Sequence, residues 1–431
     1  MEFSVFVQAF EVKDLPENNS AEPVAAPPSK PLALLVVILA SLTAFAPLSI
    51  DMYLPSFPQI AADFGVTTAR VELSLAAFFV GLAFGQLLYG SATDRFGRKR
   101  PLYIGLTVYC AASLLCAFAP NIESLIVLRF FQALGACGGI VIARATVRDL
   151  FDHSESARVF SLLMLVMGVA PILAPLGGGY VALFFGWHAI FAVVSVFSAI
   201  VLAAVYKFLP ETKQPNPNVR LSQTFGIYAN ILKDRKFLAF TFAGGFAQAG
   251  MFAYITGSPF VFIELFGIPA QSFGWVFGSN ALGLIALSQV NGRLVRSVNP
   301  TKILRVCLFV TAIFSFGLIL AGIFNLGFWS VAILIFLYVA SLGMILPNAT
   351  AGALSEQTEN AGSASALIGS LQYGLAAIAS SCVSYFNNGT TFPMTAIIGI
   401  CGIAAFTALS FLFGAKKKQH FAVSEEHVTF G

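Results

Sequence analysis

Twelve apolar runs, each about 18 residues or longer, divide this sequence, and a run of roughly that length can cross a bilayer as a helix. We expect helices at 32–57, 71–92, 102–119, 123–147, 158–184, 187–209, 237–263, 272–291, 302–324, 327–351, 361–386 and 392–414. Charged residues make up only 10% of the 431 residues, against roughly 25% in a soluble domain. The chain is therefore predicted to be an all-α integral membrane protein without a soluble enzymatic domain.

A polar, proline-containing stretch at 210–236 separates the first six helices from the last six. It predicts a cytoplasmic linker between an N-terminal bundle at 32–209 and a C-terminal bundle at 237–414. Residues 1–31 lack a basic segment before an apolar core, so we expect a disordered cytoplasmic tail and no signal peptide. Residues 415–431 are expected to form a second cytoplasmic tail.

Basic residues gather after the even-numbered helices, and Lys and Arg are retained on the cytoplasmic side of short loops. They are Arg95, Arg98, Lys99, Arg100, Arg144, Arg148, Arg158, the basic residues of 207–236, Arg293, Arg296, Lys302 and Arg305. The connections on the other side hold Arg70 alone. Both termini are therefore predicted to be cytoplasmic.

A faint internal repeat supports two related halves. Asp94-Arg95-Phe96-Gly97-Arg98-Lys99 follows the second predicted helix, and Gly292-Arg293-Leu294-Val295-Arg296-Ser297 follows the eighth. The two positions are separated by about the same distance as the first and seventh helices, as in parallel repeats of transporters.

The connection after the second helix combines an acid, a turn glycine and closely spaced cations. One interpretation is a simple cluster of retained positive charge. The run from Gly90 to Leu102 also resembles the signature loop of the major facilitator superfamily, Gly-x-Leu-x-Asp-Arg-x-Gly-Arg-Lys, with Ala92 at the leucine position. The resemblance implies a charge relay near the start of helix 11 that latches the halves on the cytoplasmic side. Its residues would be Gly90, Asp94, Arg95, Gly97, Arg98 and Lys99.

Arg129 lies in the fourth helix, about 10 Å from its start at 1.5 Å per residue. An arginine at this depth is expected to face water or an acid, unless it snorkels to the interface. Its surroundings, Leu128-Arg129-Phe130-Phe131-Gln132-Ala133-Leu134-Gly135, resemble the helix-4 motif of the same superfamily. That resemblance implies a role for Arg129 beside the proton site.

The fifth helix contains small residues and two prolines in Gly168-Val169-Ala170-Pro171-Ile172-Leu173-Ala174-Pro175-Leu176-Gly177-Gly178-Gly179. Close helix packing alone would explain such a run. It also resembles the helix-5 antiporter motif of drug exporters in the superfamily, with Ala174 where a glycine is usual. The residues assigned to this motif are Gly168, Pro171, Pro175, Gly177 and Gly178.

Asp51 is the acid that most constrains a mechanism, because the first helix is expected to continue past it to about residue 57. A carboxylate among lipid headgroups is the alternative. The run Asp51-Met52-Tyr53-Leu54-Pro55 resembles an element of the Bcr/CflA branch of drug exporters, which implies an acid in a central cavity. We expect Asp51 to carry protons and to face Arg129, so that protons and a cationic substrate compete for it. Thr43 stands where some relatives carry a second acid.

Tyr53, Glu72 and Glu264 are lesser candidates for proton or substrate binding. Glu72 and Glu264 lie near helix ends, where an interfacial position explains an acid equally well. The run Ser258-Pro259-Phe260-Val261-Phe262-Ile263-Glu264 also resembles the Bcr/CflA branch, so Glu264 is retained.

Other chemistries lack the residues they need. The sequence has no phosphate-binding Gly-x-x-x-x-Gly-Lys-Ser/Thr loop, no paired cysteines and no clustered histidines, so we expect no ATP-driven pump, enzyme, metal or cofactor. The resemblance implies two six-helix bundles that exchange protons for drug-like molecules across the bacterial inner membrane. We expect a monomer that contacts lipid and does not bind nucleic acid. An uptake symporter and a non-transporting membrane receptor or scaffold remain as alternatives.

Overall fold

The computed structural model describes residues 32–216, 221–358 and 360–426, and its regular structure is helical throughout those residues. The first half contains α2 (Leu32–Asp51), η1 (Leu54–Ser56), α3 (Phe57–Phe64), α4 (Thr68–Phe96), α5 (Lys99–Cys116), α6 (Ile122–Leu150), α7 (His153–Phe185) and α8 (Trp187–Phe208). The second half contains α10 (Arg235–Ser258), η2 (Pro259–Leu265), α11 (Ala270–Leu294), α12 (Pro300–Ile323), α13 (Gly327–Leu354), α14 (Ala361–Tyr385) and α15 (Phe392–Glu426). Between the halves lies α9 (Leu221–Ile231).

The described residues confirm twelve membrane helices. Eleven stretches are long and apolar enough to cross a membrane, with α2, η1 and α3 counted as one span and α10 with η2 as another. The twelfth helix is α5, whose 18 residues begin with Lys99 and Arg100 and are therefore less apolar. It packs against α6 and α8, in line with a spanning position in the bundle.

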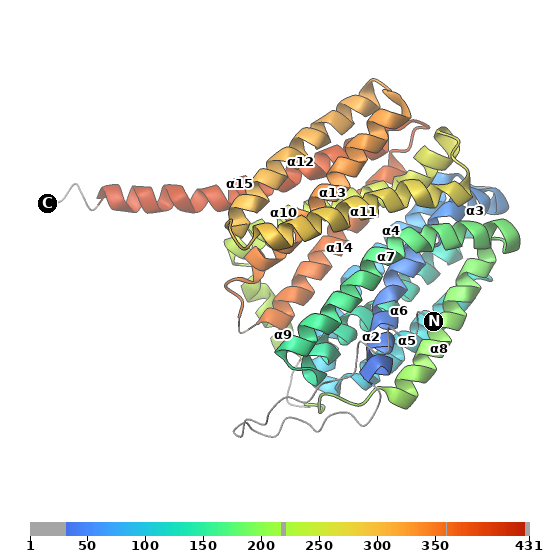
Figure 1. The fold of residues 1–431 in the computed structure, drawn as a ribbon, viewed down its shortest axis with the longest axis horizontal. Helices are drawn as coiled ribbons and strands as arrows, with labels where there is room; N and C mark the ends of the chain where they lie inside the picture. The colour runs from blue at the N-terminus through green and yellow to red at the C-terminus, as the bar shows by residue number, and fades with distance from the viewer. Residues whose placement is uncertain (1–31, 217–220, 359, 427–431) are drawn as a thin grey trace.

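Two helical bundles form the molecule, one from α2 to α8 and the other from α10 to α15 (Figure 1). They meet along two pairs of helices, α4 against α14 and α7 against α11. The linker helix α9 contacts α4 and α14, so it marks one end of the molecule. We call the opposite end, where α3 and η2 are in contact, the linker-distal end.

Several helices begin with a capping side chain. Its oxygen accepts a hydrogen bond from a backbone N–H of the first turn that has no partner within the helix. The Asn121 side chain accepts a hydrogen bond from the N–H of Ser124 at the start of α6. Asp152 accepts one from Glu155 at the start of α7, and Asp234 caps α10 in the same way. These caps fix where the helices leave their loops.

The predicted helices differ from the structure in four places. The first helix does not run unbroken to residue 57; it stops at Asp51 and resumes through η1 as α3. In the seventh, α10 gives way at Pro259 to the π-helical segment η2. Pro55 and Pro259 lack a backbone N–H, which weakens a regular helix at both sites. The linker contains α9, and α15 extends past residue 414 to Glu426. The expected tail at 1–31 lies outside the described residues.

Candidate functional site

Asp51 is the last residue of α2 and is only 4% exposed. Within the described part of the chain, no hydrogen bond or ion pair engages its carboxylate. Its charge acts on Tyr254 of α10, so the acid lies near the second bundle. The chain immediately after Asp51 packs against α7, because a Cβ on Gly178 would lie 2.0 Å from the Met52 carbonyl oxygen. The break in the first helix therefore places this acid between the halves and leaves it without a partner.

Arg129 of α6 is completely buried within the first bundle. Its Nη1 donates to the Gln132 Oε1 at 2.5 Å, whereas its Nε and Nη2 have no acceptor. The guanidinium lies over the rings of Tyr53, Phe78 and Phe191, at 4.7, 4.4 and 5.8 Å from their centroids. Three aromatic faces surround a cation that no described carboxylate neutralises.

Asp51 and Arg129, which we expect to face each other, form no ion pair within the described residues. The helix breaks directly after Asp51, and this turn brings Tyr53 over the guanidinium instead. The Tyr53 hydroxyl is hydrogen-bonded to the Ser74 hydroxyl at 2.9 Å, which ties the same ring to α4. Arg129 and Asp51 are thus joined through Tyr53, two residues along the chain, and not through an ion pair.

The glycines and prolines predicted in the fifth helix all lie on α7, which is one continuous helix that includes Pro171 and Pro175. Gly178 is the one whose size matters most, since a side chain there would collide with the Met52 backbone. A Cβ on Gly168 would meet only the end of the Ile285 side chain, at 3.1 Å, and one on Gly177 would meet nothing within 4 Å. Among these three glycines, Gly178 is therefore the one that packs against the segment after Asp51.

Two glycines on α11 complete the contact with α7. A Cβ on Gly274 would lie 2.6 Å from the Leu176 side chain, and one on Gly278 would lie 3.2 Å from that of Ile172. Sequence analysis did not single them out, although their spacing of four residues is typical of close helix contacts in membranes. The two halves are thus in close contact along α7 and α11.

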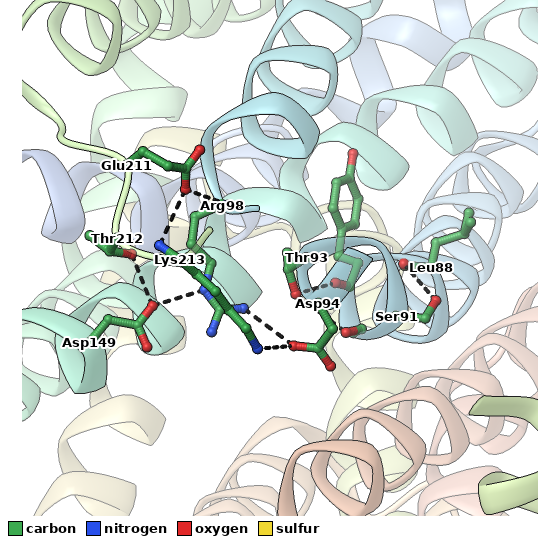
Figure 2. A network of polar contacts seen from close by, with 11 residues as sticks. Leu88, Ser91, Thr93, Asp94, Arg98, Asp149, Glu211, Thr212 and Lys213 are labelled. Atoms are coloured by element: carbon green, nitrogen blue, oxygen red, sulfur yellow. Dashed lines mark hydrogen bonds and ion pairs between the residues drawn. The ribbon is translucent and has the colours of Figure 1, made fainter. Parts of the chain in front are cut away.

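The loop between α4 and α5 forms a network of charged contacts (Figure 2). Asp94 accepts from Lys213 Nζ at 2.7 Å and lies 3.9 Å from Arg98 Nη1. Arg98 Nε in turn binds Asp149 Oδ2 at the end of α6, at 2.9 Å. The Thr212 hydroxyl donates to that same Asp149 oxygen at 2.9 Å. Residues of the linker therefore join the end of α4 to the end of α6.

Glu211 of the linker caps the start of α5. Its carboxylate accepts from the backbone N–H of Arg98 at 2.7 Å (Figure 2). It also accepts from the backbone N–H of Lys99 at 3.1 Å. Gly97 adopts a φ of +80°, and a Cβ there would lie 2.9 Å from the Lys213 carbonyl oxygen. An additional side chain is excluded at this turn by conformation and by space.

The charged side chains of this loop contact the linker and the first bundle, while the predicted relay to helix 11, which is α14, is not among the described ion pairs. Gly90 makes the nearest approach, with its Cβ position 3.1 Å from the Ala366 Cβ of α14 and 3.3 Å from the Tyr228 hydroxyl of α9. Burial and the negative charge of Asp94 raise the pKa of Tyr228, so its phenol stays neutral. Arg95 lies over the neighbouring Phe96 ring, 5.3 Å from its centroid.

Glu264 and Glu72 lie at the linker-distal end and belong to opposite halves. The Thr68 hydroxyl, at the start of α4, donates to Glu264 Oε1 of η2. Glu72, one turn further along α4, is completely buried, and neither of its carboxyl oxygens has a hydrogen-bond partner. The negative charge of Glu264 acts on it. Glu72 therefore lies inside the protein and not on its surface.

Two cavities lie away from Asp51 and Arg129. A cavity of about 500 Å³ opens between α4, α6 and α14 and is lined by Arg70 and Glu123, and another of about 320 Å³ lies between α2, α7 and α8. Neither contains Asp51 or Arg129. Among the residues that the structure describes, no three His, Cys, Asp or Glu side chains are grouped to hold a metal ion.

Sequence analysis missed the partners of the network, namely Asp149, Glu211, Thr212 and Lys213, as well as Thr68. The run Pro210-Glu211-Thr212-Lys213 was assigned to the linker by its polarity. Its alternating charges are the one signal that could have indicated partners for the loop at 94–99. Which acid pairs with which cation depends on the path of the linker, and a sequence does not supply that path.

Comparison with known proteins gives consistent matches over most of the chain. The Major Facilitator Superfamily model matches residues 39–381. The uncharacterized MFS-type transporter YdgK of Bacillus subtilis (strain 168) is 36% identical over 397 residues, which cover 91% of this chain and 98% of YdgK. The bicyclomycin resistance protein homolog of Haemophilus influenzae is 34% identical over 388 residues, covering 90% and 98%. A bacterial homolog of the human lysosomal transporter Spinster, in an inward-facing and occupied conformation, has a similar fold with a TM-score of 0.69 at 15% identity, covering 89% of this chain and 97% of the homolog.

Proposed function

The chain belongs to the major facilitator superfamily, a family of multi-pass membrane transporters and not of enzymes, and on that premise we propose that it exports drug-like small molecules in exchange for protons. Its similarity to a bicyclomycin resistance protein homolog supports a drug as the substrate class and the Bcr/CflA branch as its group. Export across the bacterial cytoplasmic membrane, with both termini inside, completes the proposal.

The observation that carries the proposal is the state of Asp51. It is a buried carboxyl with no partner, on a break in the first helix, beside the second bundle. An ionised carboxylate in such a place is unfavourable unless a cation or a proton joins it. Proton and cationic substrate would then bind alternately to the same group, which is the requirement for exchange.

Arg129 acts on Asp51 through Tyr53. The guanidinium fixes the Tyr53 ring, and Tyr53 follows Asp51 by two residues on the same turn. Because Nε and Nη2 of Arg129 lack acceptors, a rearrangement that brings an anion to them would be favourable. Arg129 is thus a positioning residue whose free donors favour a second arrangement of the α2 break.

The contact between α7 and the Asp51 segment transmits this change to the interface of the halves. Gly178 holds α7 against Met52, and two turns of the same helix pack against Gly274 and Gly278 of α11. Movement of the α2 break would therefore alter how α7 fits α11. In this proposal, the prolines and glycines of α7 seal the contact between the halves.

The driving force is sufficient for useful export. One proton returning through a potential of about 100 mV releases roughly 2.3 kcal/mol. At about 1.4 kcal/mol per tenfold ratio, this supports a substrate gradient of roughly fiftyfold. No cofactor is required by this scheme.

Transport direction can be measured in everted membrane vesicles with bicyclomycin as the first probe. The proposal predicts that energisation drives the compound into the vesicles, and that cells expressing the gene tolerate more of it. A panel of other drugs in the susceptibility assay then identifies the preferred substrate. Loss of compound from energised vesicles would indicate an uptake symporter, and unchanged susceptibility and transport across the panel would indicate a receptor or scaffold.

A further inference from the structure

The linker-distal end is closed by contacts between the two halves. There α3 lies against η2, and η1 touches both η2 and α11. The hydrogen bond from Thr68 to Glu264 adds a polar tie between α4 and η2. Any state that opens this end must separate those segments. Groups that are buried beneath them are then exposed to water.

Glu72 is buried directly beneath this closure. It lies one turn after Thr68 on α4, its side chain is 0% exposed, and both carboxyl oxygens lack a hydrogen-bond partner. Burial of an ionised carboxylate without a partner costs several kcal/mol, whereas a neutral carboxyl avoids most of that penalty. The transport scheme for Asp51 does not use this group.

Ser384 of α14 lies near Glu72, and its hydroxyl can donate to an ionised carboxylate or accept from a neutral one. The single Ser384 hydroxyl proton is given to the Ser380 carbonyl oxygen at 3.1 Å. An ionised Glu72 could receive this proton only if the Ser384 hydroxyl gave up its bond to Ser380. A protonated Glu72 can donate its own O–H to the Ser384 hydroxyl oxygen and leave that bond in place.

A neighbouring negative charge also disfavours the ionised carboxylate of Glu72. The titratable and charged groups on the elements packed around this half of α4 are Glu264 of η2, Asp63 of α3, Cys116 of α5, Glu123 and Arg129 of α6, Tyr254 of α10, and Cys382 and Tyr385 of α14, together with Arg70 of α4 itself and Tyr53, whose hydroxyl is bonded to Ser74 of α4. Arg70 is bound to Glu123 at 3.1 Å, and Asp63 accepts from the Trp187 indole at 2.7 Å. Arg129 is held among its three rings, so the charge that acts on Glu72 is the like charge of Glu264.

We propose that Glu72 is a second proton-binding group, and that the linker-distal end closes only over its neutral carboxyl. Opening exposes Glu72 to water, where it ionises; protonation allows the end to close again, with Ser384 accepting the carboxyl proton in a hydrogen bond. The inference rests on the proposed alternating access of this transporter, but it assigns the proton to a closure step and not to exchange with substrate.

Hydrogen–deuterium exchange of the purified full-length protein tests this closure without substrate. Backbone exchange is followed in segments 54–68 and 259–270 at pH 6 and pH 8, with labelling times adjusted for the pH dependence of chemical exchange. In the wild type, exchange in both segments should rise with pH, by up to about tenfold per pH unit for a single proton. Glu72→Gln, which is always neutral, should keep the slow exchange of pH 6 at both values.

Glu123→Gln is the matched control, because Glu123 is an exposed acid of the same end that is already paired with Arg70. It should respond to pH as the wild type does. Ser384→Ala gives a second test that retains the acid: loss of the acceptor should raise exchange at pH 6 toward the pH 8 level. A full pH response in Glu72→Gln, or its equal loss in Glu123→Gln, would overturn the proposal. Because no substrate is present, drug export could hold while this inference fails.

Discussion

Arg129 is a cation whose burial is hard to explain by stability alone. Its guanidinium is fully buried, with two N–H groups unsatisfied and no described carboxylate beside it. Each aromatic contact contributes about 0.5–2 kcal/mol, while the desolvation of an unpaired charge costs several kcal/mol. Three such contacts sum to about 1.5–6 kcal/mol, which at most offsets that cost. The charge therefore adds little net stability, which favours a role in transport over one in folding.

Replacement of this arginine by an apolar residue of similar volume separates the two roles. We expect Arg129→Met to leave the free energy of unfolding unchanged or to raise it by about 1–4 kcal/mol, since no buried charge remains. Drug transport should fall to background, because the Tyr53 ring then loses the cation that it packs against and keeps only its contacts within the first bundle. Thermal unfolding in detergent and vesicle transport measure the two effects. A variant that unfolds much earlier than the wild type would make Arg129 a structural residue instead.

Among the helices, α7 has the most sharply defined steric requirement. The Cβ of a Gly178→Ala variant would lie 2.0 Å from the Met52 carbonyl oxygen, which belongs to backbone and cannot move freely. We expect a loss of about 1–3 kcal/mol in stability and a drop in transport. Gly177→Ala is the matched control: its Cβ meets nothing within 4 Å, and alanine favours a helix by about 0.5–1 kcal/mol. Thermal unfolding of the two variants should therefore shift in opposite directions.

The linker segment is predicted to hold the loop between α4 and α5. Glu211→Ala removes the acceptor of two backbone N–H groups, so hydrogen exchange at 97–101 should become faster and drug resistance should decrease. Glu356→Ala is a suitable comparison, because Glu356 also forms an ion pair between segments, with Lys236 at 2.8 Å, but caps no helix. Equal exchange at 97–101 in both variants would show that the linker does not support this loop.

The sequence predicted the elements better than it predicted their contacts. The lengths of the apolar runs located all twelve helices, because every helix that crosses a bilayer needs an apolar run of nearly the same length. The breaks after Asp51 and at Pro259 were not predicted, since proline is tolerated in membrane helices and breaks them only where neighbouring packing permits. The position of Tyr53 was not predicted either: the break turns its ring to the Arg129 guanidinium.

At the scale of the whole molecule, contacts of different character hold the two halves and the linker together at different places. Small residues pack α7 against α11, the linker binds the loop between α4 and α5, and Thr68 binds Glu264 at the linker-distal end. Alternating access requires that some of these contacts separate while others form. Asp51 lies where the first helix breaks between the halves, so its protonation can affect both bundles.

The central claim is that Asp51 exchanges a proton for substrate. It is tested most directly by adding the drug identified in the susceptibility profile to purified protein in weakly buffered detergent and recording the pH. The wild type should release protons, Asp51→Asn should release none, and Asp63→Asn, which alters an exposed acid on α3, should match the wild type. Proton release from Asp51→Asn at the wild-type level would contradict the account.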